Sequence, residues 1–410
     1  MQNLKRREVS YQSGEVETKS PEVEPKSWEI IWQSGEVGPE SGEQTANTVQ
    51  KCFVNLLFLQ KYPLKRGIYS LYDERVEKRS DNMIVKPLTM PIQIRKLEAL
   101  LNRIPIHDEK RDRIFSDYQK AYSGYIGEKA MQYPLSYLDP EKYLIFHDIR
   151  LNAGEHFFQI DILILSTKYI MISEVKNITG KLFIDHEHKQ LIRTSDEKEE
   201  SFTYPIDQLT LQQIQLKKWL HQHSFPLLPI EGLVVFTNES SILTSSRPNE
   251  KIIKKSTFIH RMYDLERRFS KVPDYPQNIN SLSETILQNH EPQNKPILQK
   301  YQIFKDELQL GVQCPKCHQF SMSRIYKYWV CSRCGTSSKT AYLKALEEYA
   351  LLFDIVLTNK EGRDFLKIES PHIMQTIFNN ISAIKAGENR TAKYIISLEV
   401  LMKMKKSIVE

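Results

Sequence analysis

Residues 156–177 read HFFQIDILILSTKYIMISEVKN, and this stretch decides the fold of the chain. It contains two aromatic and β-branched runs, 156–165 and 169–176, which predict two consecutive strands. Parts of both runs are continuously apolar, which is typical of strands buried on both faces of a sheet. Charged residues close these strands, and α/β folds place their sites at the ends of strands.

Three charged residues of this stretch form a pattern with chemical meaning: Asp161, Glu174 and Lys176. Glu174 and Lys176 are two positions apart in one predicted strand, so their side chains point to the same face of the sheet. A hairpin brings Asp161 near Glu174, which pairs two hard oxygen ligands for Mg²⁺ or Mn²⁺. Such an ion lowers the pKa of a bound water, and a neighbouring ammonium orients the water or stabilises a pentavalent phosphorus. Glu128, on a preceding predicted helix, adds a third carboxylate.

The apolar spacing on either side of this stretch predicts the rest of an α/β unit. Helices are expected over roughly 92–104 and 108–131, and another helix follows Pro205. Strands are expected at 143–147, 156–165, 169–176, 181–184 and 232–236. Helix, several strands, helix, strand is the order of an α/β sandwich, here with a mixed central sheet.

Four short motifs occur in a fixed order along this unit. They are Gly124-Tyr-Ile-Gly-Glu128, Phe157-Phe-Gln-Ile-Asp161, Glu174-Val-Lys-Asn177 and Pro205-Ile-Asp-Gln208. Together they resemble the nuclease-related domain (NERD) family over roughly 119–236, and that family resembles the PD-(D/E)XK nucleases. The resemblance implies a restriction-endonuclease-like sandwich in which Glu128, Asp161 and Glu174 are metal-binding carboxylates. It also implies that Lys176 is the catalytic lysine and that Gln208 is a helix-borne glutamine near the DNA backbone.

Four of the five cysteines form two pairs of the type C-x2-C. The pairs are Cys314-Pro-Lys-Cys317 and Cys331-Ser-Arg-Cys334. Each tight turn aims two thiolates at one point, so the four predict a closed, structural zinc site in a zinc ribbon. A pair of redox-active dithiols is the weaker alternative, because redox chemistry needs only one such pair.

The predicted ribbon carries cations interleaved with aromatic side chains, including Lys327, Tyr328, Trp329 and Arg333. This combination suits phosphate contact and base stacking, particularly on single strands. The alternative is that the aromatic residues form the small core of the ribbon.

The expected organisation has six segments. They are an acidic N-terminal extension (1–82), a helical lead-in (83–118), the nuclease-like domain (119–240), a helical and loop connector (241–308), the zinc ribbon (309–336) and a helical module (337–410). The extension repeats QSGEV at 12–16 and 33–37 and is poor in apolar residues, so we expect it to be disordered, and Met83 is a plausible alternative start. In the last segment, a helix that begins at Ser370-Pro371 and a strand over 389–396 suit a helix-turn-helix with a wing, although any compact helical module gives a similar pattern.

Composition narrows the class of protein. The 410 residues carry a net charge of +6, and residues 1–50 contain nine glutamates and five basic residues, so residues 51–410 carry +10, which favours an anionic partner. An odd cysteine count, with Cys52 left over, excludes a disulfide scaffold. No apolar run approaches the ~20 residues of a membrane helix, and no secretory signal is apparent, so a cytoplasmic protein is expected.

The sequence thus predicts a Mg²⁺- or Mn²⁺-dependent nuclease whose zinc ribbon assists in binding nucleic acid. DNA is the expected substrate, and RNA stays open because the chemistry acts on phosphate. The rival hypothesis is a non-catalytic nucleic-acid-binding or stress-response adaptor that keeps the nuclease fold as a scaffold. A separate alternative for Asp161, Glu174 and Lys176 taken alone is that they belong to an ordinary solvated sheet face.

Overall fold

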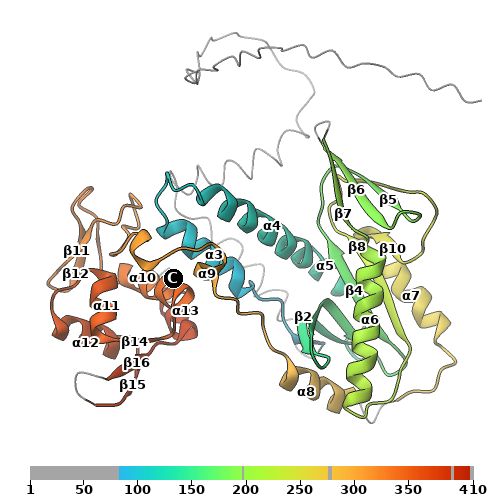
Figure 1. Cartoon of the computed structure of the whole chain (residues 1–410). Coiled ribbons are helices and arrows are strands. Elements are labelled where there is room, and N and C mark those ends of the chain that lie inside the picture. Colours follow the sequence, from blue (N-terminus) through green and yellow to red (C-terminus); the bar gives the residue numbers. More distant parts are fainter. Residues whose placement is uncertain (1–82, 196–197, 276–278, 389–391, 407–410) are drawn as a thin grey trace, which may run out of the picture. The chain divides into compact units, whose positions relative to one another are not determined.

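The computed structural model describes residues 83–195, 198–275, 279–388 and 392–406 (Figure 1). All described residues belong to one compact unit of the chain, referred to below as the second unit because it follows the N-terminal residues. The expected disordered extension, its repeat and Cys52 lie outside the described residues.

A mixed sheet of six strands forms the centre of the nuclease-like part, in the order β1-β2-β3-β4-β8-β10. The strands are β1 (Ile84–Lys86), β2 (Leu144–Asn152), β3 (Phe157–Leu165), β4 (Ile170–Lys176), β8 (Ile230–Phe236) and β10 (Ile252–Lys254). Strands β2, β3 and β4 are antiparallel neighbours, whereas β1 is parallel to β2 and both β8 and β10 continue the sheet in parallel with β4. This arrangement confirms the mixed central sheet expected from the apolar runs.

Helices cover both faces of this sheet. They are α5 (Gln132–Leu135), α6 (Pro205–Gln222), α7 (Phe258–Arg268) and α8 (Ile279–Asn289). The C-terminal end of α4 (Arg111–Ala130) approaches the end of β4. Buried side chains of α6 and α8, such as Trp219 and Ile286, pack in one core on one face. Those of α5 and α7, such as Leu135 and Phe258, pack in a second core on the other. Helix α6 begins with Pro205 in its first turn, where the missing N–H needs no partner.

Two parts of this fold differ from the expectation. A second, four-stranded sheet, in the order β7-β6-β5-β9, lies outside the main one. Its strands are β5 (Lys181–Asp185), β6 (Gln190–Ser195), β7 (Lys198–Thr203) and β9 (Ile242–Ser245). Within the segment expected as a connector (241–308), β10 forms an edge of the main sheet, and α7 and α8 cover its faces.

The C-terminal part contains the cysteine-rich hairpins and a mixed module with one shared core. Its elements are β11 (Met322–Ile325), β12 (Tyr328–Cys331), β13 (Ser337–Ser338), α10 (Ala341–Leu352), β14 (Val356–Thr358), α11 (Asn359–Leu366), α12 (Pro371–Asn380), β15 (Ile384–Ala386), β16 (Lys393–Ile395) and α13 (Leu398–Lys406). Buried residues of β12, α10 and α11, such as Trp329, Leu346 and Phe365, belong to one hydrophobic cluster. The ribbon and the module therefore share this cluster, which is called the common core below.

Two helices from other parts of the second unit pack near this C-terminal core: α3 (Ile92–Arg103) and the short α9 (Ile297–Lys300). The buried guanidinium of Arg103 on α3 donates to Glu348 on α10 over 2.8 Å and to the carbonyl oxygen of Gln309 over 2.7 Å. These bonds satisfy a charge that would be expensive to bury alone.

Candidate functional site

The predicted charged residues of β3 and β4 meet at one end of the main sheet. The antiparallel register pairs Ile162 with Ser173, which brings Asp161 beside the end of β4. Its Oδ2 accepts the backbone N–H of Val175 over 2.8 Å. On β4, the Lys176 ammonium donates to Oε1 of Glu174 over 2.8 Å, and the Glu174 side chain is only 3% exposed. The two side chains therefore share one face, as their spacing predicts.

Helix α6 adds two glutamines to this face. The Lys176 ammonium also donates to Oε1 of Gln208 over 2.9 Å, so the lysine lies between a carboxylate and an amide. One turn later, the amide of Gln212 donates to Oε2 of Glu174 over 2.6 Å and to the carbonyl oxygen of Gln159 over 2.9 Å. Gln212 was not anticipated, although a glutamine four residues after Gln208 lies on the same face of a helix.

Close packing at the end of α4 brings the third predicted carboxylate, Glu128, to the site. A Cβ on Gly127 would lie 2.5 Å from the Cβ of Asn177, so only glycine allows this approach of α4 to the end of β4. The Asn177 amide then donates to the carbonyl oxygen of Ser123 over 2.8 Å. Gly127 thus permits the close contact between α4 and the end of β4, and this contact positions the adjacent Glu128 at the site.

Burial and mutual repulsion raise the pKa values of two of these carboxyl groups. Burial raises the pKa of Glu128 to about 9, with further repulsion from Asp161 and Asp148. Burial and the neighbouring Glu174 likewise raise the pKa of Asp161 to about 8. One oxygen of Glu128, Oε2, is buried without a hydrogen-bond partner. Hard oxygen ligands whose negative charges repel each other are a donor set that fits Mg²⁺ or Mn²⁺.

Asp148 is a fourth carboxylate, which the sequence reasoning missed. The register pairs His147 with Ile162 and Ile149 with Ile160, so Asp148 forms an irregularity of β2 opposite Asp161, with a left-handed φ of 51°. Its Oδ1 accepts the Gln159 amide over 2.7 Å. The sequence carries one indication of it, since Asp148 and the adjacent His147 interrupt the apolar residues of this strand.

Lys86 of β1 supports this irregularity from the neighbouring strand. Its ammonium donates to the carbonyl oxygens of His147 over 2.7 Å and of Asp148 over 3.0 Å. Burial lowers the pKa of Lys86, although Asp148 and Glu128 partly oppose the shift. A second lysine is therefore near the carboxylates, on a strand too short to be recognised from sequence.

The carboxylates are not as tightly gathered as the cysteines. Within the described part of the chain, only the four cysteines bring three or more ligand atoms within 4.8 Å of one another. Like charges separate, and the two oxygens of Glu174 accept hydrogen bonds from Lys176 and Gln212.

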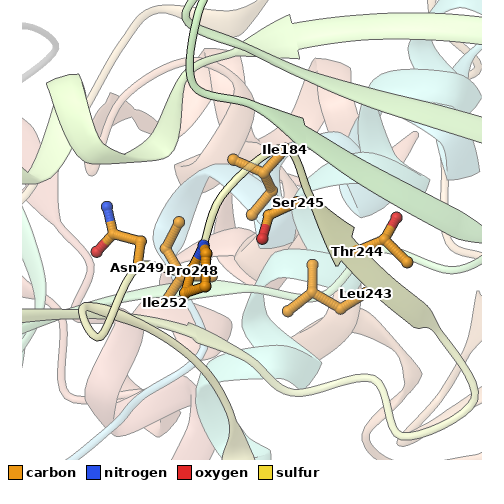
Figure 2. Close-up of a pocket in the computed structure, with 7 residues that line it drawn as sticks. All are labelled: Ile184, Leu243, Thr244, Ser245, Pro248, Asn249 and Ile252. Atoms are coloured by element: carbon orange, nitrogen blue, oxygen red, sulfur yellow. The ribbon is translucent and has the colours of Figure 1, made fainter.

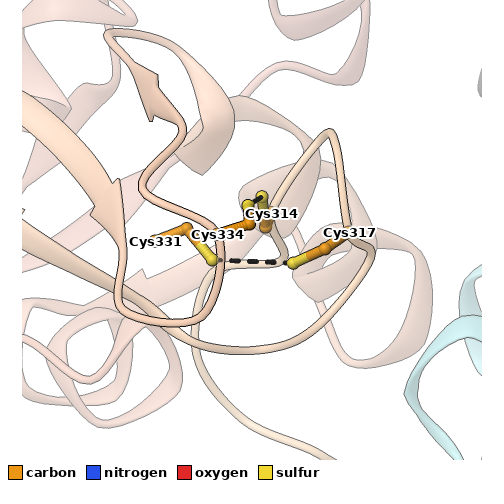
Figure 3. Close-up of side chains that lie close together, drawn as sticks. All are labelled: Cys314, Cys317, Cys331 and Cys334. Atoms are coloured by element: carbon orange, nitrogen blue, oxygen red, sulfur yellow. Dashed lines mark hydrogen bonds between the residues drawn. The ribbon is translucent and has the colours of Figure 1, made fainter.

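Cys314, Cys317, Cys331 and Cys334 converge as predicted (Figure 3). The sulfur atoms of Cys314 and Cys334 lie 3.6 Å apart, and so do those of Cys317 and Cys331. A tetrahedral zinc ion with Zn–S bonds of about 2.3 Å requires sulfur atoms about 3.8 Å apart, so the four thiols fit such an ion.

Each C-x2-C turn closes in the same way. The residue after the second cysteine adopts a left-handed conformation in both turns, with φ of 59° at His318 and 71° at Gly335. Glycine suits this conformation best, and histidine tolerates it better than most residues do.

The surface of the ribbon corrects one expectation. Trp329 is fully buried in the common core, so it is not available to stack on a base. Tyr328 and the neighbouring Tyr326 are exposed, and the ammonium of Lys327 lies 5.5 Å from the ring centre of Tyr326. Arg333 is also exposed. The exposed cation–aromatic pairs of the ribbon are therefore Lys327 with Tyr326 and Lys339 with Tyr328, the latter 5.4 Å apart.

A separate cavity of about 280 Å³ lies between β5, β9 and β10 (Figure 2). It is lined by Ile184, Leu243, Thr244, Ser245, Pro248, Asn249 and Ile252. This lining contains no ionisable side chain, so the cavity offers nothing for acid–base or metal chemistry. None of the described helices combines the length and the apolar composition that crossing a bilayer requires.

Comparison with known protein families gives one match. Residues 123–237 match the family described as nuclease-related domain. Comparison of the chain with curated proteins and with solved structures gives no match. The matched segment begins within α4, just before Glu128, and ends just after β8. The residues at the ends of β3 and β4 and their neighbours, referred to below as the strand-end site, are Glu128, Asp148, Asp161, Glu174, Lys176, Gln208 and Gln212. All of them lie within residues 123–237, which are thus a nuclease-related domain.

Proposed function

We propose that this protein is a metal-dependent nuclease that hydrolyses phosphodiester bonds, with DNA as its substrate. The observation that carries the proposal is the position of Lys176. Its ammonium lies 2.8 Å from Glu174 and 2.9 Å from Gln208, beside Asp161, in a nuclease-related domain. A cation so placed can stabilise the charge that develops on a phosphoryl group under attack.

Asp161, Glu174 and Glu128 would hold Mg²⁺ or Mn²⁺, and Asp148 extends the same group of carboxylates. A bound divalent ion supplies Lewis acidity, which acidifies a water molecule and neutralises charge on a phosphoryl oxygen. The unpartnered Oε2 of Glu128 and the raised pKa values of Glu128 and Asp161 support cation binding.

The other residues of the site would position these groups. Gln212 orients Glu174 by donating to one carboxylate oxygen, while Lys176 donates to the other. Gln208 holds the ammonium of Lys176 from the first turn of α6, where it would lie near the nucleic-acid backbone. The lysine can then donate to the attacking water or to a phosphoryl oxygen.

The ribbon would assist binding without taking part in the chemistry. Four thiolates fill a tetrahedral site, so a zinc ion held there has no open position for a substrate. Lys327 and Arg333 would contact phosphates, and Tyr326 and Tyr328 would stack on bases. The four described cysteines are free thiols, which suits the reducing cytoplasm.

A combined binding and cleavage experiment tests the proposal. Full-length protein is titrated with Mn²⁺ and then incubated with duplex, single-stranded and branched DNA and with RNA. We expect a Mn²⁺ site that is lost in Asp161→Asn and cleavage that is lost in the same variant. Asp274→Asn, at an aspartate outside the strand-end site, is the control.

The rival adaptor gives a different result. An adaptor binds zinc through its cysteines and binds nucleic acid, but shows no carboxylate-dependent Mn²⁺ site and no cleavage. RNA cleavage with no DNA cleavage would keep the nuclease and overturn the choice of substrate.

A further inference from the structure

Within the C-terminal part, the segment 341–395 contains a helix-turn-helix followed by a β-hairpin. Its elements follow in the order α10, β14, α11, α12, β15 and β16, and the sheet order is β14-β16-β15 (Figure 1). Helix α11 ends at Lys367, whose φ is 58°, and Ser370 caps α12 by accepting from the N–H of Ile373. The short turn between them fixes the direction in which α12 leaves α11.

Helix α12 has one buried face and one polar face on which no Lys, Arg, Asp or Glu occurs. Met374, Ile377 and Phe378 are buried in the common core. His372, Thr376 and Asn379 are exposed and lie at the four- and three-residue spacings of one helical stripe. Such side chains offer hydrogen-bond donors and acceptors without charge, and these are the groups that read base edges in a major groove.

The hairpin of β15 and β16 is fixed to α12. The ring of Tyr394 on β16 stacks on Phe378 at 4.1 Å between centres, with 11° between planes. Its hydroxyl donates to Oε1 of Gln375 over 2.5 Å. Lys385 and Lys393 are exposed on the two paired strands. Two cations therefore have a defined position relative to the polar face of α12.

The aromatic residues of this module distinguish between ligands. Phe365, Phe378 and Tyr394 are the aromatic residues of the described part of 356–396, and all three are buried. Single-stranded nucleic acid is bound mainly by stacking on exposed aromatic rings, and the described residues of 356–396 offer no exposed Phe, Tyr or Trp ring. A recognition helix fits the major groove of B-form DNA, whereas the deep, narrow major groove of A-form RNA does not admit one.

We propose that α12 and the β15–β16 hairpin form a binding surface for duplex DNA, distinct from the nuclease site. The polar stripe of α12 enters the major groove, and Lys385 and Lys393 contact phosphates on either side. This surface anchors the protein on a duplex whether or not the carboxylate site cleaves it.

Fluorescence anisotropy of a labelled DNA duplex tests the proposal. The full chain is used with its zinc and without Mg²⁺ or Mn²⁺, so that cleavage does not enter the measurement. We expect Lys385→Glu/Lys393→Glu to weaken binding at least about tenfold. We also expect it to reduce the slope of log K against log salt by about 2, at ~0.9 for each lost phosphate contact. The control is Lys271→Glu/Lys295→Glu, which changes the net charge equally at exposed lysines elsewhere.

A second variant tests the helix itself. Asn379→Asp keeps the size of the side chain and its acceptor for the Gln375 amide, but places a negative charge on the polar stripe. We expect weaker duplex binding with an unchanged melting temperature. Unchanged affinity in both variants would overturn the proposal, and so would an equal loss of single-stranded DNA or duplex RNA binding in the same variants. A protein that cleaves no DNA but shows these losses keeps this inference and loses the proposed nuclease function.

Discussion

At the scale of single residues, the strand-end site contains carboxyl groups whose ionisation is unfavourable. Glu128 and Asp161 keep their protons to a higher pH than free carboxyl groups do, because burial disfavours their charged forms and neighbouring carboxylates repel them. In the unfolded chain both ionise near pH 4. The folded protein therefore binds more protons than the unfolded chain between about pH 4 and the folded pKa values of about 8 and 9.

This difference sets the sign of a pH effect on stability. Without divalent ions, the free energy of unfolding should decrease as pH rises from 5 to 8, by about 1–3 kcal/mol. Glu128→Gln removes one of the responsible groups, so it should be more stable than wild type at pH 8, with a smaller difference at pH 5. Urea unfolding at both pH values measures this, and Glu141→Gln, at an exposed carboxylate, is the control.

Mn²⁺ should offset the decrease in the free energy of unfolding at pH 8, because an ion that binds the ionised carboxylates stabilises only the folded state. A wild-type stability that rises between pH 5 and pH 8 without metal, or Glu128→Gln with the wild-type profile, would show that this carboxylate is not strained.

At the scale of elements, the site depends on how closely α4 approaches β4. A methyl group on Gly127 would collide with Asn177, while the same change at Gly124 meets no atom within 4 Å. We expect Gly127→Ala to destabilise the protein by about 1–3 kcal/mol, as overpacking does. Gly124→Ala should instead stabilise it by up to about 1 kcal/mol through helix propensity. Denaturant unfolding of both variants measures the contrast.

The same pair of variants reports on metal binding. Because Gly127→Ala moves α4 and with it Glu128, Mn²⁺ affinity should decrease, whereas Gly124→Ala should keep it. Equal Mn²⁺ affinity in the two variants would mean that Glu128 is not a ligand.

Elements also show which parts of the fold the sequence could reveal. β3 and β4 were predictable because buried strands of seven to nine residues leave long apolar runs. β10 has three residues, and β7 reads KEESFT with no apolar alternation, so their pairing depends on neighbours that a sequence pattern does not contain.

The residues of the candidate site also fall into those that the sequence pattern predicts and those that it does not. Glu174 and Lys176 were predictable because residues two apart in a strand always share a face. Asp148 and Gln212 were missed because their positions depend on an irregularity in β2 and on the docking of α6. Trp329 was misassigned, since a residue pattern does not show which ring of a small hairpin fills its core.

At the scale of the whole molecule, the ribbon and the C-terminal module share one hydrophobic core, so we expect them to fold and unfold together. Cys314 and Cys331 are buried in the same cluster as residues of α10, α11 and α12. Losing the metal should therefore unfold the module together with the ribbon, while the nuclease-related domain, with cores of its own, persists.

Cys331→Ser tests this coupling. We expect loss of hydrogen-exchange protection across residues 312–401, with protection retained in β3 and β4. Ser332→Ala, next to Cys331, is the control. If α10 to α12 kept full protection in Cys331→Ser, the module would be independent of the metal, and the common core would contribute little to stability.

The central claim is that the strand-end site cleaves nucleic acid through Lys176. The most direct measurement is the cleavage rate of a labelled DNA panel with Mg²⁺, for wild type, Lys176→Ala and the exposed-lysine control Lys181→Ala. We predict cleavage by wild type and Lys181→Ala, and a loss of at least about 10²-fold in Lys176→Ala, as expected when a group that stabilises developing charge is removed. Wild-type protein without Mg²⁺-dependent cleavage, or Lys176→Ala cleaving at the wild-type rate, would contradict the claim.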